Sequence, residues 1–450
     1  MHYEKFADGS IKCIEDEIPF ELPEGWEWCR LKHICMMLAG KSKPKEQIKS
    51  APFNGCYPCF GGNGIRGYTD EYNQDGTYSI VGRQGALCGN INIASGKFYA
   101  TEHAVVTTLF SGIDFIWSNY TLEALHLNEY ATGAAQPGLS VANILNVFVP
   151  LAPTQEQERI GHKISAIIEL LDLIKQEKLD LLTIVTNTKA KILYLAIRGK
   201  LVPQDPNDEP ASVLLDRIRA DKEELIKQGK IKRDNKESVI FKGEDNSYYE
   251  KIGDTITCFC SEMPFEIPAN WTWCRLENCC SKEIKRGKSP KYANSGNTLV
   301  FAQKCNTKYD GININLALYL DESTSNKYLY DEYMQDGDTV INSTGTGTLG
   351  RVGIYRQSDN KKNSPIVPDS HVTVIRAYNC INSNYIYIFL KALQNELEKM
   401  GEGSTNQKEL KPLTLKQLLV PLPPMQEQER MVRLILILFN RLDQIEKSLN

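Results

Sequence analysis

A long stretch with helical periodicity, residues 154–200, constrains this chain more than any other feature. Alternate steps of four and three residues from Ile160 visit eleven positions, of which nine are apolar. This spacing is typical of a coiled-coil seam. Thr154 and Gln157 fit a capping box, and Gly199 can end the helix in the left-handed conformation. About 45 residues would form a rod of roughly 68 Å, which is longer than one compact domain needs.

The start of this helix is repeated near the end of the chain. The sequence VPLAPTQEQER at 149–159 returns 271 residues later, at 420–430, with nine of eleven positions identical. The apolar seam returns with it, from Met431 to Ile445. Two helices with matching seams can pair, and antiparallel pairing would relate two halves by a pseudo-twofold axis. The second helix is shorter, so pairing over part of the length is expected.

A second repeated segment begins each domain. Residues 19–31 return, shifted by 245, at 264–276, with nine of thirteen positions identical. Trp26 and Trp28 lie two residues apart and would share one face of a strand, where packing in a core is favoured over base stacking. The predicted organisation is a connector at 1–18, a first domain at 19–153, the central helix at 154–200, a turn with a charged helix and connector at 201–262, a second domain at 263–424 and a distal helix at 425–450.

These repeats predict an α+β fold class. Short alternating runs broken by Gly and Asn fill the middle of each domain and are typical of strands. We therefore expect two similar β-rich domains separated by long helices that form an antiparallel coiled coil, with a pseudo-twofold internal repeat.

Composition sets modest limits. A chain of 450 residues is too long for one core. We expect a cytoplasmic location without a membrane, because no apolar run could span a bilayer and no signal peptide is evident. The 13 cysteines favour free thiols in a reducing compartment. Cys56 and Cys59 have the spacing of a zinc knuckle, but no second matching pair lies nearby, so zinc is disfavoured.

Each domain carries a short basic turn soon after its repeated first segment. Gly40-Lys-Ser-Lys-Pro-Lys45 in the first matches Gly287-Lys-Ser-Pro-Lys291 in the second. Lysines beside Gly and Pro on a loop suit phosphate contact, because the backbone can approach closely. A merely solvated loop is the alternative, and recurrence in both domains favours the DNA backbone.

The domain framework recurs while its loop residues differ. The loop residues that could contact DNA are Arg83 and Gln84 in the first domain, and Asn342 and Thr344 in the second. Two copies of one scaffold that read different ligands show this pattern, since side chains that meet base edges change with the sequence read. The candidate DNA-contacting residues are Lys41, Lys43, Lys45, Asn63, Arg66, Arg83, Gln84, Lys288, Lys291, Lys304, Asn342, Ser343, Thr344 and Thr346.

Each half also carries a predicted strand that contains a histidine, His103 in the first and His371 in the second. No nucleophile or carboxylate motif accompanies either residue. A buried, hydrogen-bonded histidine is therefore favoured over a catalytic base.

The order of these parts resembles the specificity subunit of type I restriction-modification enzymes over essentially the whole chain. The resemblance rests on the two Gln-Glu-Gln-Glu-Arg helices, the Arg198-Gly-Lys-Leu-Val-Pro203 turn, the Leu-Pro-x-x-Trp segments and the loop Asn342-Ser-Thr-Gly-Thr-Gly347. It implies two target-recognition domains that each read one half of a bipartite site in double-stranded DNA. The helices would set the spacer and dock two methyltransferase subunits, through Gln155, Glu156, Arg159, Gln426, Glu427 and Arg430.

The same resemblance places the chemistry in other subunits. Methyltransferase and restriction subunits would bring S-adenosylmethionine, ATP and Mg, and no cofactor, metal or catalytic residue is expected in this chain. The sequence agrees, because it has no Asn-Pro-Pro-Tyr or Asp-Pro-Pro-Tyr motif, Walker A loop or nuclease cluster. Two alternatives stay open: a self-contained DNA modification enzyme, and a coiled-coil scaffold that binds protein.

Overall fold

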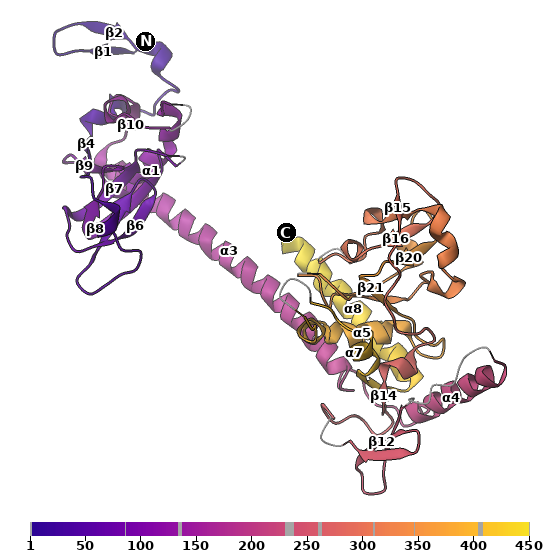
Figure 1. Cartoon of the computed structure of the whole chain (residues 1–450). Helices are drawn as coiled ribbons and strands as arrows, with labels where there is room; N and C mark the ends of the chain where they lie inside the picture. The colour runs from indigo at the N-terminus through magenta and orange to yellow at the C-terminus, as the bar shows by residue number, and fades with distance from the viewer. Residues whose placement is uncertain are drawn as a thin grey trace. The chain divides into compact units, whose positions relative to one another are not determined.

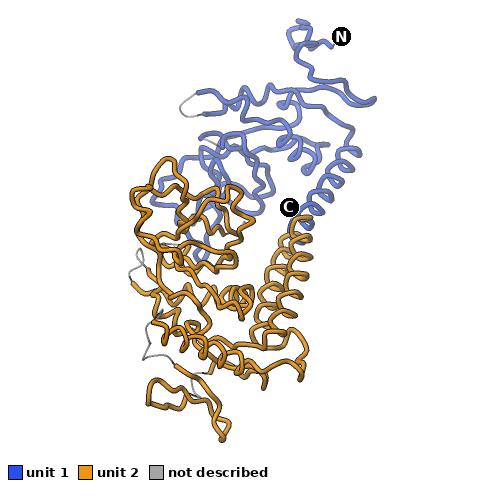
Figure 2. Tube along the Cα trace, turned by 90° about the vertical axis from the view of Figure 1, so that its right-hand side faces the viewer, with its two compact units in different colours: residues 1–177 blue, residues 178–450 orange. Residues whose placement is uncertain are grey.

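The computed structural model describes residues 2–85, 87–133, 137–229, 238–259, 263–308, 311–345, 347–403 and 408–449. The chain forms two compact units, Met1–Glu177 and Lys178–Asn450 (Figure 2). Their boundary lies within helix α3, Thr154–Ala196, which continues from the first unit into the second (Figure 1).

Unit 1 is built on a six-stranded sheet with strand order β4-β9-β7-β8-β5-β6. All neighbouring strands are antiparallel except β5 and β8. Ile80 and Phe98 fill one core beside the sheet, because their strands point alternate side chains inward. The strands are β4 (Cys35–Ala39), β5 (Tyr57–Gly61), β6 (Gly64–Thr69), β7 (Gln74–Gly82), β8 (Ile91–Ala100) and β9 (Ala104–Leu109).

Outside this sheet, unit 1 has two short strand pairs and two short helices. Strands β3 and β10 pair where the repeated segments begin and end, with Trp28 opposite Pro150. Trp117 on α1 is buried in the core beside these strands. The remaining elements are β1 (Tyr3–Lys5), β2 (Ile11–Cys13), β3 (Glu27–Arg30), α1 (Phe115–Ala124), α2 (Val141–Ile144) and β10 (Phe148–Leu151).

Unit 2 repeats this plan with smaller sheets. Strands β14 and β22 pair in the same register as β3 and β10, with Trp273 opposite Pro421. The sheets have the orders β19-β18-β21 and β15-β17-β16-β20. Their strands are β14 (Thr272–Arg275), β15 (Tyr292–Ala293), β16 (Leu299–Phe301), β17 (Leu318–Leu320), β18 (Thr339–Asn342), β19 (Val352–Ile354), β20 (Ile366–Pro368), β21 (Val372–Ile375) and β22 (Leu419–Leu422).

The segment between α3 and the second domain is structured over most of its length. A charged helix is followed by a three-stranded sheet of order β11-β12-β13. Helices α5, α6 and α7 lie between β21 and β22, and α8 follows β22. These elements are α4 (Ala211–Lys227), β11 (Ser238–Lys242), β12 (Tyr248–Ile252), β13 (Thr255–Cys258), α5 (Ser383–Ala392), α6 (Gln394–Lys399), α7 (Pro412–Lys416) and α8 (Met425–Leu449).

Within unit 2, α3 and α8 pair in antiparallel orientation. Lys189 Nζ lies 2.7 Å from Asp443 Oδ1 and 2.6 Å from Glu446 Oε2, near the end of α8. Ala196, at the end of α3, shares a core with Met431, near the start of α8. This confirms the predicted coiled coil, in which the apolar seams of the two helices meet. Figures 1 and 2 both show the two helices side by side.

The start of α3 differs from the predicted capping box. Thr154 Oγ1 donates to the carbonyl of Gly112 at 2.9 Å, so it does not cap its own helix. Gln157 is buried, where its Oε1 accepts from Asp114 N and its Nε2 donates to Ala152 O. The capping-box prediction was therefore wrong, because tertiary partners of the domain take both side chains.

The end of α3 follows the prediction. Gly199 has φ +64°, and its amide donates to Ala196 O at 3.1 Å. This is the left-handed stop that glycine adopts without a steric cost. Among the described residues, no helix is both long enough and apolar enough to cross a membrane.

Candidate nucleic-acid interface

In unit 1, three loops meet beyond the end of β7 and the start of β9, where Gly82 pairs with Ala104. The amide of Arg83 donates to His103 O at 2.9 Å, and the amide of Leu139 donates to Arg83 O at 2.8 Å. Gly82 makes this approach possible, because a Cβ there would lie 2.0 Å from Gly62 O. The backbone therefore fixes these loops to one another, independently of their exposed side chains.

The joined loops surround a polar hollow of about 390 Å³. Arg83, Gln84 and His103 line it, and Arg83 and Gln84 are exposed. Asn63 is also exposed and accepts from Asn90 Nδ2 at 2.9 Å, while Arg66 is exposed on β6. Amide and guanidinium groups of this kind are the donors and acceptors that read base edges.

Unit 2 builds the same backbone frame. The amide of Ser343 donates to His371 O at 2.8 Å, and the amide of Leu410 donates to Ser343 O at 2.8 Å. Ser343 thus takes the place of Arg83, and Thr344 takes that of Gln84. Thr344 Oγ1 lies 2.7 Å from His371 Nδ1, so the loop polar groups differ from those of unit 1 although the frame is shared.

Each basic turn lies beside the loop that carries the histidine, and a matching glycine in each turn makes this close approach possible. A Cβ at Gly40 would lie 2.1 Å from Ala100 O, and one at Gly287 would lie 2.2 Å from Pro368 O. Both turns therefore need glycine to pack against the strand that leads into the histidine loop. Lys41 and Lys288, which follow these glycines, are exposed in corresponding places.

The two turns differ in how their charges are balanced. Lys288 Nζ lies 2.6 Å from Glu332 Oε2, and Lys291 Nζ lies 2.7 Å from Asp321 Oδ2. Burial opposes ionisation of Glu332, yet Lys288 and a backbone amide hold its pKa below the ordinary value. Lys291 lowers the pKa of Asp321 to about 2.

In unit 1, by contrast, the exposed cations of the basic turn and of the neighbouring loops lack such carboxylates. The structure gives no ion pair to four of them within its described ranges: Lys41, Lys45, Arg66 and Arg83. Lys304 in unit 2 is likewise exposed and without an ion pair in the described part of the chain. Uncompensated cations are those available to phosphates without loss of an internal partner.

Three of the predicted DNA contacts are buried side chains. Lys43 is 5 % exposed, and its Nζ lies 2.5 Å from Glu71 Oε1. Asn342 and Ser343 are fully buried; Asn342 Nδ2 donates to Gln303 O, and Ser343 Oγ bonds Thr373 Oγ1. These three side chains hold the loop frame and are removed from the contact set. Thr346 lies outside the described residues.

Neither His103 nor His371 is buried. The side chain of His103 is 39 % exposed, with Nε2 3.4 Å from Glu102 Oε1, and His371 is exposed. The prediction of buried histidines was therefore wrong. Each lies on a loop whose backbone carbonyl holds the neighbouring loop, and the equal placement of both in the two halves was the available signal.

Some of the predicted docking residues make contacts inside unit 2, and others are exposed. Glu427 is fully buried and Arg430 pairs with Asp208, so these two serve contacts inside unit 2 and are removed from the docking surface. Gln155 and Gln426 are exposed at the helix starts.

Sequence reasoning missed the second glutamine of each motif. Gln428 accepts from Asn382 N and donates to Pro423 O, both at 2.9 Å. Gln157 makes the matching pair of bonds in unit 1. Each glutamine therefore fixes its helix to the neighbouring domain, and the repeated motif was the signal.

The Cys56 and Cys59 pair has other roles. Cys56 Sγ accepts from Phe53 N at 3.3 Å, and Cys59 is buried within β5. Across the described residues, no group of three or more His, Cys, Asp or Glu side chains could hold a metal ion.

Curated relatives of this chain are specificity subunits. It is 48 % identical over 151 residues to the type I restriction enzyme EcoprrI specificity subunit of Escherichia coli, covering 33 % of this chain and 36 % of that protein. It is 24 % identical to the EcoEI specificity subunit of the same species, covering 98 % of this chain and 82 % of that protein. For the EcoAI specificity subunit the identity is 30 %, over 58 % of this chain and 52 % of that protein.

Solved structures share the fold at low sequence identity. A chain from a study of complex assembly and conformational transition of the type I R-M system matches with TM-score 0.60 and 15 % identity, covering 96 % of this chain and 94 % of that one. The HsdS subunit from Thermoanaerobacter tengcongensis matches with TM-score 0.54 and 15 % identity, over 96 % and 93 %. The family model described as Type I restriction modification DNA specificity domain matches residues 23–183 and 268–450, and the chain therefore belongs to this family.

Proposed function

We propose that this chain is the DNA-reading, non-catalytic subunit of a type I restriction-modification complex. Each unit reads one half of a bipartite site in double-stranded DNA. The long helices set the spacer between the half-sites and offer Gln155 and Gln426 to two methyltransferase subunits.

One observation carries this proposal: the two units hold different polar side chains on the same loop frame. Arg83 and Gln84 occupy in unit 1 the places of Ser343 and Thr344 in unit 2, with the same backbone bonds to a histidine loop. A catalytic pair of sites would keep its reactive groups alike, whereas two readers of different sequences must differ there.

The loop cations and the loop amides have different tasks in this proposal. Lys41, Lys45 and Arg66 neutralise phosphates, which adds affinity that falls with salt and carries no sequence information. Arg83 and Gln84 present two donors or a donor and an acceptor to a base edge, which adds discrimination.

The remaining chemistry is assigned to partners. Methyltransferase subunits bind S-adenosylmethionine and methylate adenine, while restriction subunits use ATP and Mg to cut unmodified DNA. The assembly works in the cytoplasm, where the DNA lies. The polar loops support this division, because each offers hydrogen-bonding groups of the kind that read DNA.

The test is a map of methylated adenines in DNA from cells that express this chain with its methyltransferase subunit. We expect a split motif with two defined half-sites and a fixed spacer. Methylation of a single continuous motif would contradict two separate readers.

Two further outcomes address the alternatives. Binding of S-adenosylmethionine by the purified chain alone would show a self-contained modification enzyme. Sequence-independent DNA binding by the assembled complex would favour a scaffold over a reader.

A further inference from the structure

In unit 2, the turn after α3 is held by the start of α8. Glu427 Oε1 accepts from Gln204 Nε2 at 2.6 Å, and its Oε2 accepts from Trp271 Nε1 at 2.9 Å. Arg430 makes a bidentate pair with Asp208, at 3.0 and 2.6 Å. The turn thus satisfies a buried carboxylate and a guanidinium of the Gln-Glu-Gln-Glu-Arg helix.

The helices on either side of this turn cover apolar surface. Ile192 and Ala196 of α3 share a core with Leu214 and Ile218 of α4. This core also holds the indole of Trp271 and the seam residues Met431 and Ile435. A helix-turn-helix segment, residues 190–228, therefore buries the tryptophan and the α8 seam together.

Unit 1 presents the same receiving surface. Trp26 corresponds to Trp271, Glu156 to Glu427 and Arg159 to Arg430 by the repeat shifts of 245 and 271. Arg30 pairs with Glu4 as Arg275 pairs with Glu250, so the surroundings correspond as well.

Three polar groups of this surface make no hydrogen bond or ion pair among the described residues. Trp26 Nε1 is buried and has no acceptor. Among the described residues, the carboxylate of Glu156 and the guanidinium of Arg159 have no hydrogen-bond or ion-pair partner. A buried N–H without an acceptor costs free energy that a bound partner would recover.

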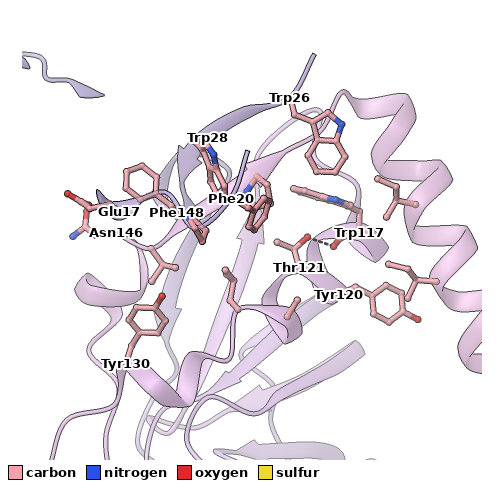
Figure 3. A pocket seen from close by; sticks show the side chains of 17 residues that line it. Glu17, Phe20, Trp26, Trp28, Trp117, Tyr120, Thr121, Tyr130, Asn146 and Phe148 are labelled. Carbon is pink, nitrogen blue, oxygen red and sulfur yellow. Dashed lines mark hydrogen bonds between the residues drawn. The ribbon is translucent and has the colours of Figure 1, made fainter. Parts of the chain in front are cut away.

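An apolar pocket of about 600 Å³ adjoins these groups. Trp26, Trp117 and Tyr120 line it together with Ile160 and Ile164 of α3, as Figure 3 shows for the labelled aromatic side chains. Ile160 and Ile164 are the counterparts of Met431 and Ile435, which unit 2 buries. The pocket therefore lies where the helix-turn-helix segment packs in unit 2.

We propose that this surface of unit 1 docks a helix-turn-helix segment like residues 190–228, carried by a separate polypeptide. The bound turn places a Gln-x-x-x-Asp sequence so that the glutamine donates to Glu156 and the aspartate pairs with Arg159. Glu156 then also accepts from Trp26 Nε1. Residues 190–228 are themselves seated in unit 2, so they do not fill this surface. This docking is independent of DNA reading.

The test uses the full-length chain and a labelled synthetic peptide of residues 190–228, with binding followed by fluorescence anisotropy. We expect saturable binding with one peptide per chain. Arg159→Asp in the chain weakens binding about tenfold or more, because a charge-assisted pair becomes a repulsion. Asp208→Arg in the peptide does the same, and the two changes together restore binding.

Matched controls separate this pairing from general charge effects. Lys163→Asp makes the same charge change at an exposed position of α3, and Asp221→Arg does so at an exposed position of the peptide. Neither should weaken binding by more than about twofold. Trp26→Phe supplies an independent variant, which removes the unpaired donor together with part of the ring and should weaken binding severalfold.

Three outcomes would overturn the proposal. The peptide could fail to saturate, or Arg159→Asp could leave its affinity unchanged. The chain alone could also form dimers that Arg159→Asp dissolves, in which case a second copy and not a separate segment fills the site.

Discussion

Lys41 and Lys288 occupy matching turns but differ in their internal partners. Lys288 is paired with Glu332, whereas Lys41 has no ion pair among the described residues. A lysine that must leave a carboxylate to reach a phosphate gains less from binding DNA. The tertiary fold brings Lys288 and Glu332 together, so the matching Gly-Lys-Ser sequences could not reveal their ion pair.

This difference predicts unequal effects on DNA binding by the assembled complex. Lys41→Ala should lower affinity equally for all sequences and reduce the slope of log affinity against log salt by about 1. Lys288→Ala should change the slope less. Salt titrations of each complex measure both effects, and equal slopes for the two variants would contradict the role assigned to Glu332.

Arg83 belongs to a different class of contact. Arg83→Ala should cost about 1–3 kcal/mol at one base pair of one half-site and leave the other half-site unchanged. Affinities for a panel of single-base variants give the readout, with Lys41→Ala as the matched phosphate control. A uniform loss on every sequence would demote Arg83 to a backbone contact.

Glu427 makes unit 2 sensitive to pH. Burial raises the pKa of its carboxyl above the ordinary value, although Trp271 and Gln204 donate to it. A raised folded-state pKa gives stability that is present below the unfolded pKa and lost as pH rises through the folded pKa. The free energy of unfolding of the wild type relative to Glu427→Gln should therefore fall from about pH 4 to about pH 7.

Urea unfolding at both pH values measures this change. Glu429→Gln, an exposed neighbour on the same helix, is the control and should track the wild type. If wild type and Glu427→Gln differed by the same amount at both pH values, the carboxyl would not be titrating differently in the folded state.

At the level of helices and strands, the apolar spacing and the internal repeats predicted the features that depend on local sequence. The seam predicted α3 and its antiparallel partner, and Gly199 predicted the stop, because both depend on backbone geometry and spacing. The capping box failed because Gln157 bonds Asp114 N, a partner 43 residues away. Likewise the burial of Lys43 depends on Glu71, which no local pattern indicates.

The end of α3 gives a stability prediction. Gly199→Ala should destabilise unit 2 by about 1–3 kcal/mol through its left-handed φ. A further loss is expected because the new Cβ would lie 2.4 Å from Pro268 Cγ. Gly229→Ala is the control, since Gly229 has φ +71° with no atom within 4 Å of its Cβ position. Equal losses in thermal unfolding would show that the Pro268 contact relaxes without cost.

At the level of the complete chain, the proposed function makes the two units separable readers joined by one helix, α3. Replacing residues 19–153 by the corresponding domain of a related chain should change one half-site only. The spacer and the other half-site should stay the same, because α3 and unit 2 are untouched. Methylated-adenine mapping of the chimera provides the measurement, and a change in both half-sites would contradict independent reading.

The chain enters and leaves each domain through one strand pair, β3 with β10 or β14 with β22, in the same register. The segments that form these pairs are also nearly identical in sequence. In a genome, such repeats are places where genes cross over. A single exchange there would transplant a complete reader without disturbing the fold, so a bacterial lineage could acquire a new methylation pattern in one step of inheritance.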